Sequence, residues 1–215
     1  MMAQDSKRGS ALVEVIKSDD VTDLFKDYGE LVIDSALESG TLESIPLLNT
    51  LVGIFKTASS VHDRRFTEKL IRFISGFADL DDATRINMAN RLNENDKFAG
   101  KAGDRLIEII DRMESENKPE IAAAFLKAFA FEYIDFITLR RLMVALERIP
   151  SFEIDELDTF SKYDENNHHQ ISDEALLLSF VNAGLGKNNG GFDGGIILPT
   201  DLCTAFVRFK GFKPE

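Results

Sequence analysis

The residues best suited to chemistry gather in one polar stretch, which reads YDENNHHQISDEA. Carboxylate and amide oxygens are the ligands that calcium prefers, and Asp164, Asn166 and Ile171 fall at positions one, three and eight of an EF-hand loop. The rest of the loop does not fit. Position six is His169, where the loop needs a glycine for its sharp turn, and position twelve is Ala175, where calcium needs a bidentate glutamate. We therefore predict no calcium site in this stretch.

Other patterns that carry chemistry are also missing from the sequence. His168 and His169 are adjacent, so their side chains point apart in most backbone conformations, and His62 lies far from them in the chain. Cys203, the only cysteine, stands in an apolar helical segment and is interpreted as a small core residue. The loop KNNGGFDGG lacks the Lys-Ser/Thr ending of a phosphate-binding loop, and GxSxG, HExxH and CxxC motifs are absent. The sequence predicts no catalytic, cofactor-binding or metal-binding residue and no cofactor, and it favours a protein that is not an enzyme.

The composition is that of an acidic globular protein. The 215 residues carry a formal net charge of −12, which argues against a general DNA- or RNA-binding protein and against attraction to anionic membranes. A single cysteine excludes an intramolecular disulfide, and the first ten residues lack the apolar core of a signal peptide. No uncharged run approaches the ~18 residues of a membrane-spanning helix. We expect a cytoplasmic protein that is not integral to a membrane.

An apolar helix is expected at residues 45–60, and the rest of the chain is expected to pack around it and the helix that follows. Apolar side chains cover more than half of its circumference, which is typical of a helix buried in a protein core or in a membrane. Its uncharged run, residues 45–55, spans only ~16 Å, about half of a bilayer core. We interpret it first as a core helix and second as a helix that inserts into a membrane. The residues that would do either are Leu47, Leu48, Leu51, Val52, Ile54 and Phe55.

The second helix of this pair is amphipathic, with Asp63 as the expected N-cap. Its apolar face consists of residues spaced by three and four, namely Phe66, Leu70, Phe73, Ile74 and Phe77. Its opposite face is rich in cations, and the possible interaction surface consists of Arg64, Arg65, Lys69 and Arg72. Such a face is either a solvated surface with pairs between residues four apart, or a docking patch for an acidic partner or anionic lipid.

Three regions are predicted along the chain. Residues 1–18 are expected to be flexible, although residues 11–17 also fit a strand or a helical turn, and residues 19–150 are expected to form an irregular helical bundle. Helices are predicted at residues 19–39, 83–92, 98–113, 121–131 and 133–149, in addition to the central pair. Asp81 or Asp82 is expected to cap the second of these. The last is expected to bury Ile134, Ile137, Leu142, Ala145 and Ile149.

The third region, residues 151–215, differs in composition. Between residues 151 and 175 there are eight acidic residues against one base, Lys162. A helix at 172–183, a glycine-rich hairpin, a strand at 196–198 and a last helix at 201–209 resemble the second half of a winged-helix domain, with Cys203 in place of a common glycine. The helix that would read DNA has no Arg or Lys to reach bases or phosphates, so we expect protein contacts rather than DNA. The predicted fold class is mainly all-α, an irregular multi-helix bundle with a small winged-helix-like α+β tail containing a short hairpin.

The segment from Asp19 to Leu185 resembles a set of bacterial cytosolic helical proteins with no assigned activity. The likeness lies in the acidic first helix, the apolar helix that begins Ile-Pro, and the Asp-Arg-x-Phe turn at residues 63–66. It implies a helical fold and a bacterial or phage origin, and it brings no cofactor or catalytic residue.

Two functions follow from these observations. The first is a regulatory protein that acts through contacts with a protein partner or with itself, as a homodimer. The second is a membrane-acting effector of the conflict or phage-defence type, which releases the apolar helix 45–60 together with the apolar segment 121–131.

Overall fold

The computed structural model describes residues 2–18, 61–95, 102–114, 117–167, 173–190 and 195–214. The chain divides into two compact units, Met1–Ala123 and Ala124–Glu215. The division falls inside helix α8, Asn117–Ala130, whereas the sequence places a boundary at residue 150. Within unit 2 the ring of Phe125 in α8 lies 5.1 Å from that of Phe206 near the C-terminus, and a separate domain after residue 150 stays a prediction.

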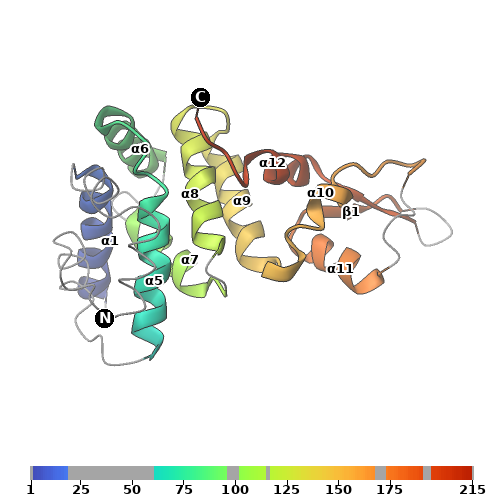
Figure 1. The fold of residues 1–215 in the computed structure, drawn as a ribbon, viewed down its shortest axis with the longest axis horizontal. Helices are drawn as coiled ribbons and strands as arrows, with labels where there is room; N and C mark the ends of the chain where they lie inside the picture. Colours follow the sequence, from blue (N-terminus) through green and yellow to red (C-terminus); the bar gives the residue numbers. More distant parts are fainter. Residues whose placement is uncertain are drawn as a thin grey trace. The chain divides into compact units, whose positions relative to one another are not determined.

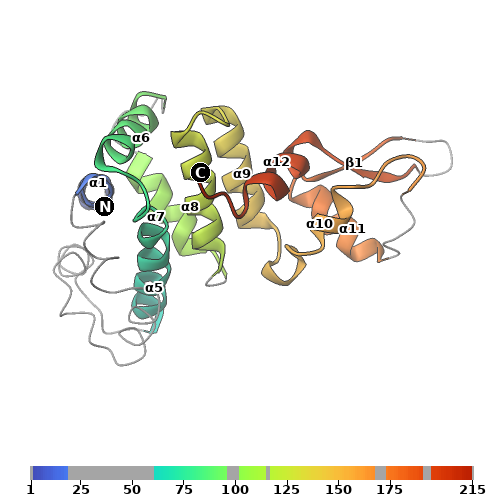
Figure 2. The same cartoon turned by 45° about the horizontal axis from the view of Figure 1, so that its top comes forward.

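Unit 1 begins with helix α1, Met2–Lys17, where the sequence predicts a flexible segment. The helix forms because Leu12, Val15 and Ile16, spaced by three and four, are buried against α6, Asp82–Asn95, and α7, Ala102–Arg112 (Figures 1 and 2). The backbones of α1 and α7 meet at two glycines. A Cβ atom added to Gly103 would collide with the backbone of Gly9, and the Gly9 N–H donates to the Asp104 carboxylate at 2.9 Å.

Helix α5, Val61–Ser75, is the second helix of the predicted central pair. Its predicted apolar face is confirmed, because all five residues are buried: Phe66, Leu70, Phe73, Ile74 and Phe77. The rings of Phe73 and Phe77 meet edge to face, with centroids 5.0 Å apart. The helix begins two residues before the predicted cap, Asp63. The first helix of the pair, residues 45–60, lies outside the described residues, as does the predicted helix 19–39.

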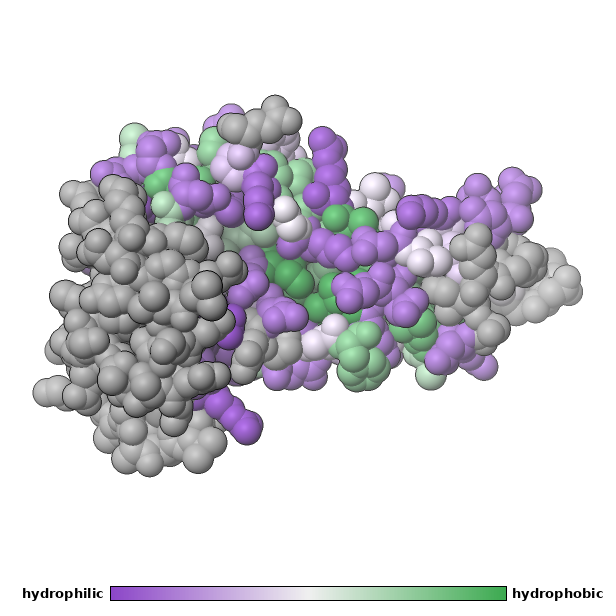
Figure 3. Space-filling model, viewed as in Figure 1, coloured by the Kyte–Doolittle hydropathy of each residue, from purple (hydrophilic) through white to green (hydrophobic). Residues whose placement is uncertain are grey.

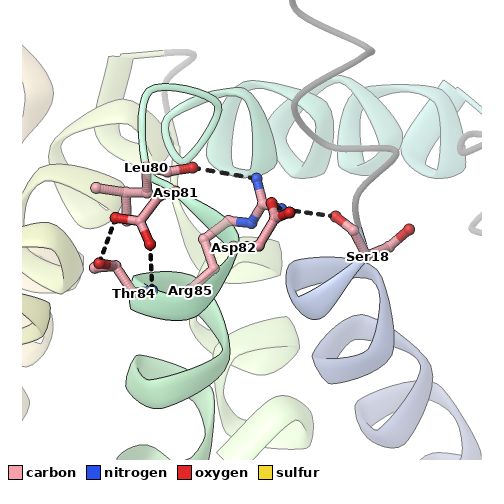
Figure 4. A network of polar contacts seen from close by, with 6 residues as sticks. All are labelled: Ser18, Leu80, Asp81, Asp82, Thr84 and Arg85. Atoms are coloured by element: carbon pink, nitrogen blue, oxygen red, sulfur yellow. Dashed lines mark hydrogen bonds and ion pairs between the residues drawn. The ribbon is translucent and has the colours of Figure 1, made fainter.

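A buried arginine connects α1 with the start of α6 (Figure 4). Arg85 is fully buried and donates to the carbonyl oxygens of Ser18, at 3.1 Å, and Leu80, at 3.4 Å, and it pairs with the Asp82 carboxylate. The Asp81 carboxylate accepts from the Thr84 N–H at 2.9 Å and from the Thr84 hydroxyl at 2.7 Å, and these bonds lower the pKa of Asp81. The aspartates at this turn therefore cap and anchor a helix, which confirms the predicted cap.

Unit 2 holds the second half of α8 and the elements that follow it. These are α9, Phe136–Arg148; the 3-10 helix η2, Ser151–Glu153; α10, Leu157–Phe160; α11, Glu174–Asn182; β1, Gly186–Asn188; β2, Ile197–Pro199; and α12, Asp201–Phe209. The strands are antiparallel, with Lys187 opposite Leu198. The fold is mainly helical with one small hairpin near the C-terminus, as predicted. The order helix, hairpin, helix over α11, β1–β2 and α12 also follows the prediction, with β2 displaced by one residue.

The core of unit 2 is aromatic and aliphatic. The rings of Phe160 in α10 and Phe180 in α11 lie 4.8 Å apart. Cys203 is buried in α12, where burial raises the pKa of its thiol to about 12. The helix α9 buries Ile134, Leu142, Ala145 and Ile149 in its region as predicted.

The same prediction is wrong for Ile137, whose exposed fraction is 61%. At ~100° per residue, Ile137 lies ~140° around the helix from the fully buried Leu142. The inner face of α9 is instead completed by Leu139, Met143 and Leu146.

Candidate binding groove

An open groove of about 680 Å³ lies within unit 2. One side is the outer face of α9, and the other side is made by the turn after α11 and the first turn of α12. The lining residues are Ile137, Arg140, Arg141, Val144 and Arg148 from α9, and Ala183, Gly184, Thr200, Asp201 and Leu202 from the opposite side.

The α9 side of the groove combines cations with apolar side chains. At ~100° per residue, the five α9 residues fall within one stripe about 100° wide, opposite the buried face. Ile137 and Val144, seven residues apart, are 61% and 38% exposed. Arg140, Arg141 and Arg148 alternate with them. In Figure 3, apolar residues likewise reach the surface between hydrophilic ones over the coloured part of the molecule.

The three guanidinium groups have few internal partners. Arg140 lies 6.0 Å from the centre of the Phe136 ring. Arg141 lies near Asp135, the N-cap of α9, whose carboxylate accepts from the Thr138 N–H at 2.7 Å. The pKa of Asp135 is lowered, chiefly by hydrogen bonds from Thr138 and to a lesser extent by the charge of Arg141. Among the described residues, none of the three arginines forms a salt bridge within 4.0 Å.

The opposite side is held by two helix caps. Gly184 ends α11 in the left-handed conformation, with φ of 79°, and the Leu185 N–H donates back to the Phe180 carbonyl at 2.8 Å. The Thr200 hydroxyl donates to the Gly184 and Leu185 carbonyls at 3.1 Å and accepts from the Cys203 N–H at 3.2 Å. Because these bonds tie the end of α11 to the start of α12, this side of the groove is preformed. Asp201 is the one carboxylate among the lining residues, against three guanidinium groups.

The predicted interaction surface on α5 differs from the groove in that some of its cations have partners within unit 1. The Lys69 ammonium donates to the Asp111 carbonyl at 2.8 Å, and burial lowers the pKa of Lys69. Arg72 forms a salt bridge with Glu120 at 3.3 Å. Arg65 is exposed, and the side chain of Arg64 lies outside the described residues. Two of the four cations are therefore engaged within unit 1, and a docking role for this face stays a prediction.

The acidic region after residue 150 takes part in an internal ion-pair cluster. Lys210 at the end of α12 pairs with Asp158 at 2.8 Å and reaches Asp155 at 4.0 Å. The part of the chain that the structure describes holds no group of His, Cys, Asp and Glu side chains that could bind a metal ion. The pair His168–His169 lies outside that part.

Sequence reasoning did not identify the groove. Its signal was present in α9, where the apolar residues form two stripes, one at 139, 142, 143 and 146 and one at 137 and 144. The second stripe coincides with three arginines, a combination that marks an exposed amphipathic surface rather than a core.

No helix within the described ranges is both long enough and apolar enough to cross a membrane. The apolar segment of α8 is buried, as predicted, over residues 122–129. The other half of the membrane-acting hypothesis, the helix at residues 45–60, lies outside those ranges.

Comparisons of the chain with known protein families, with curated proteins and with solved structures find no match. The resemblance to bacterial cytosolic helical proteins therefore stays a prediction, and function is argued from the groove itself.

Proposed function

We propose that this protein is an interaction protein whose groove in unit 2 binds an acidic, amphipathic segment of a protein. The observation that carries the proposal is the set of three arginines around the exposed Ile137 and Val144, none of which forms a salt bridge with a described residue. A cation on a folded surface without an internal partner is available to an anionic one, and the rim charges of an interface set its specificity and association rate.

The apolar residues of the groove favour a protein segment over a nucleic acid or a small anion. Ile137 and Val144 lie about two turns apart on the same face of α9, and Leu202 contributes from α12. Helices that bind in grooves place apolar anchors at such spacings and charged residues beside them. Unit 2 carries fourteen Asp and Glu against nine Lys and Arg, a net charge of −5, so a nucleic acid strand that extends beyond the groove is repelled.

The chemistry of the lining supports binding rather than catalysis. The lining residues include no histidine, cysteine or lysine, and the one hydroxyl, on Thr200, is engaged in the cap of α12. A general base or a nucleophile in this groove has no second group to activate it.

The test is binding of a labelled helical peptide with glutamates on one face and leucines on the other, followed by fluorescence anisotropy. We expect saturable binding to the full-length protein. We expect Arg141→Glu/Arg148→Glu to weaken it about tenfold, because each lost exposed pair contributes roughly 0.2–1 kcal/mol and reversal adds repulsion of similar size.

Two controls make the test specific. The same peptide with lysine in place of glutamate should not bind, and Lys187→Glu, at an exposed lysine of β1 outside the groove lining, should leave binding unchanged. Equal binding by the wild type and by Arg141→Glu/Arg148→Glu would overturn the proposal.

A further inference from the structure

Unit 2 also carries a second exposed surface, which is acidic, whereas the groove is rich in arginine. We give the name acidic surface to the exposed side chains that η2, the turn after it and α11 carry, two segments joined by a hydrogen bond between Ser179 and Glu153: Phe152, Asp155, Glu156, Glu174 and Leu178. Phe152 is 83% exposed and Leu178 is 48% exposed. The side chain of Asp155 is fully exposed, and Glu156 and Glu174 are exposed.

The elements that carry the acidic surface form one packed body. The Ser179 hydroxyl of α11 donates to the Glu153 carboxylate of η2, and these two residues are the chain neighbours of Leu178 and Phe152. The rings of Phe160 and Phe180 hold α10 against α11. The exposed phenyl and leucyl groups are therefore presented on a fixed scaffold.

The acidic surface and the groove do not neutralise each other within one molecule. Among the described residues, Glu156 and Glu174 form no ion pair, and the three groove arginines form none either. Glu156, Glu174 and the three guanidinium groups therefore remain available on the same unit, whereas Asp155 lies 4.0 Å from Lys210. Exposed apolar groups accompany both sets: Phe152 and Leu178 on one surface, Ile137 and Val144 on the other.

We infer that the acidic partner of the groove is a second copy of this chain, so that the acidic surface of each copy fills the groove of the other. This inference rests on the proposed function and names its partner. In a two-fold dimer each copy places its acidic surface in the groove of the other, so two equivalent contacts form together. Both grooves are then filled, and no further copy can add to the dimer. The carboxylates meet the arginines of the partner, and the apolar groups meet in the centre of each contact.

Ionic strength decides the conditions for observing the dimer. Two copies of net charge −12 repel each other at long range, while the paired surfaces attract at close range. At ~0.15 M salt the Debye length is about 8 Å, which screens the long-range repulsion and leaves the close contacts. We therefore expect a dimer at this salt concentration and its weakening at about 1 M.

The experiment is sedimentation velocity of the full-length protein over a range of concentrations, with two charge-reversed variants. Arg141→Glu/Arg148→Glu makes the groove acidic, and Glu156→Lys/Glu174→Lys makes the acidic surface basic. Each variant alone is expected to be monomeric, because both contacts then bring like charges together. Their equimolar mixture is expected to regain the dimer, because both contacts then bring opposite charges together.

The rescue by mixing also shows that both variants fold. A matched control, Lys187→Glu/Asp164→Lys, reverses exposed charges outside both surfaces and is expected to leave the dimer unchanged. A dimer that persists in every variant, a mixture that stays monomeric, or oligomers that grow steadily with concentration would each overturn the closed dimer.

The peptide measurement separates the two proposals. A wild-type protein that stays monomeric but binds the acidic helical peptide overturns the self-association and leaves the proposed function standing. A protein that is monomeric and binds no acidic peptide overturns both.

Discussion

The basic faces of α5 and α9 are alike in sequence and different in the folded protein. Both helices carry arginines or lysines at helical spacing beside a buried apolar face. On α5, Lys69 and Arg72 are bound by acceptors of unit 1, whereas on α9 the three arginines form no salt bridge with a described residue. We therefore expect a basic helical face to be available for binding only where the fold leaves it without internal acceptors.

The difference arises from what packs beside each helix. α5 lies against α7, and the acceptors of its cations come from the end of α7 and the start of α8, at Asp111 and Glu120. The outer face of α9 looks across an open groove to two helix ends that offer one carboxylate, Asp201. The comparison makes the following predictions, from the largest expected effect to the smallest.

The largest difference is expected between substitutions on the two faces of α9, in their effect on the free energy of unfolding. Leu142→Ala removes a fully buried side chain and is expected to lower the free energy of unfolding by about 2–5 kcal/mol. Ile137→Ala is expected to change it by less than about 0.5 kcal/mol, because the side chain is exposed. Chemical denaturation measures both. A comparable loss for the two variants would show that Ile137 is buried and that the groove is not an open surface.

Reversing a charge on α5 should lower the stability of the protein, whereas reversing a charge on α9 should lower peptide binding. Lys69→Glu removes the bond to the Asp111 carbonyl and places a carboxylate beside Asp111, so we expect a loss of about 1–3 kcal/mol of stability. Arg148→Glu is expected to cost less than about 0.5 kcal/mol and to act on peptide binding instead. If Arg148→Glu destabilises the protein as much as Lys69→Glu, Arg148 has an internal role.

The Arg72–Glu120 pair should show a small coupling. A double-mutant cycle with Arg72→Ala and Glu120→Ala is expected to give about 0.2–1 kcal/mol, the range of exposed ion pairs, since Glu120 is half exposed. The same cycle with Arg65, two turns earlier on α5, in place of Arg72 is expected to give no coupling with Glu120, and a measurable value there would contradict the assignment.

The smallest effect concerns Asp135, a carboxylate near the groove arginine Arg141. The pKa of Asp135 is lowered chiefly by Thr138 and to a lesser extent by Arg141, so Thr138→Ala is expected to raise it more than Arg141→Ala. Because the pKa is depressed in the folded state, the stability that this cap contributes is present above the unfolded pKa of about 3.9 and is lost as pH falls through the folded value. Carbon-detected NMR titration of Asp135 measures the order of the two shifts.

Much of the fold could be predicted from local patterns. The buried face of α5 followed from the spacing of its phenylalanines, and the cap at Asp81 and the hairpin before α12 followed from turn chemistry. These signals are contained within a few residues of sequence.

The groove could not be predicted, because it depends on packing between distant residues. The acceptors of Lys69 and Arg72 lie 42 and 48 residues away, and no local pattern reports them. Ile137 was assigned to the core because one apolar residue near a helix start fits either face until its neighbours are known. The helix at the N-terminus was missed for the same reason: its apolar stripe is short and depends on α6 and α7 for burial.

The two glycines at which α1 meets α7 limit the substitutions that this sequence can accept during evolution. A side chain at Gly103 collides with the backbone of Gly9, and a side chain at Gly9 collides with Asp104, so neither site can accept even alanine while the helices keep their spacing. A compensating change at the other site is excluded, since glycine is already the smallest residue. In a lineage that keeps α1 docked, both positions are expected to stay glycine, and they are expected to change together where α1 is lost.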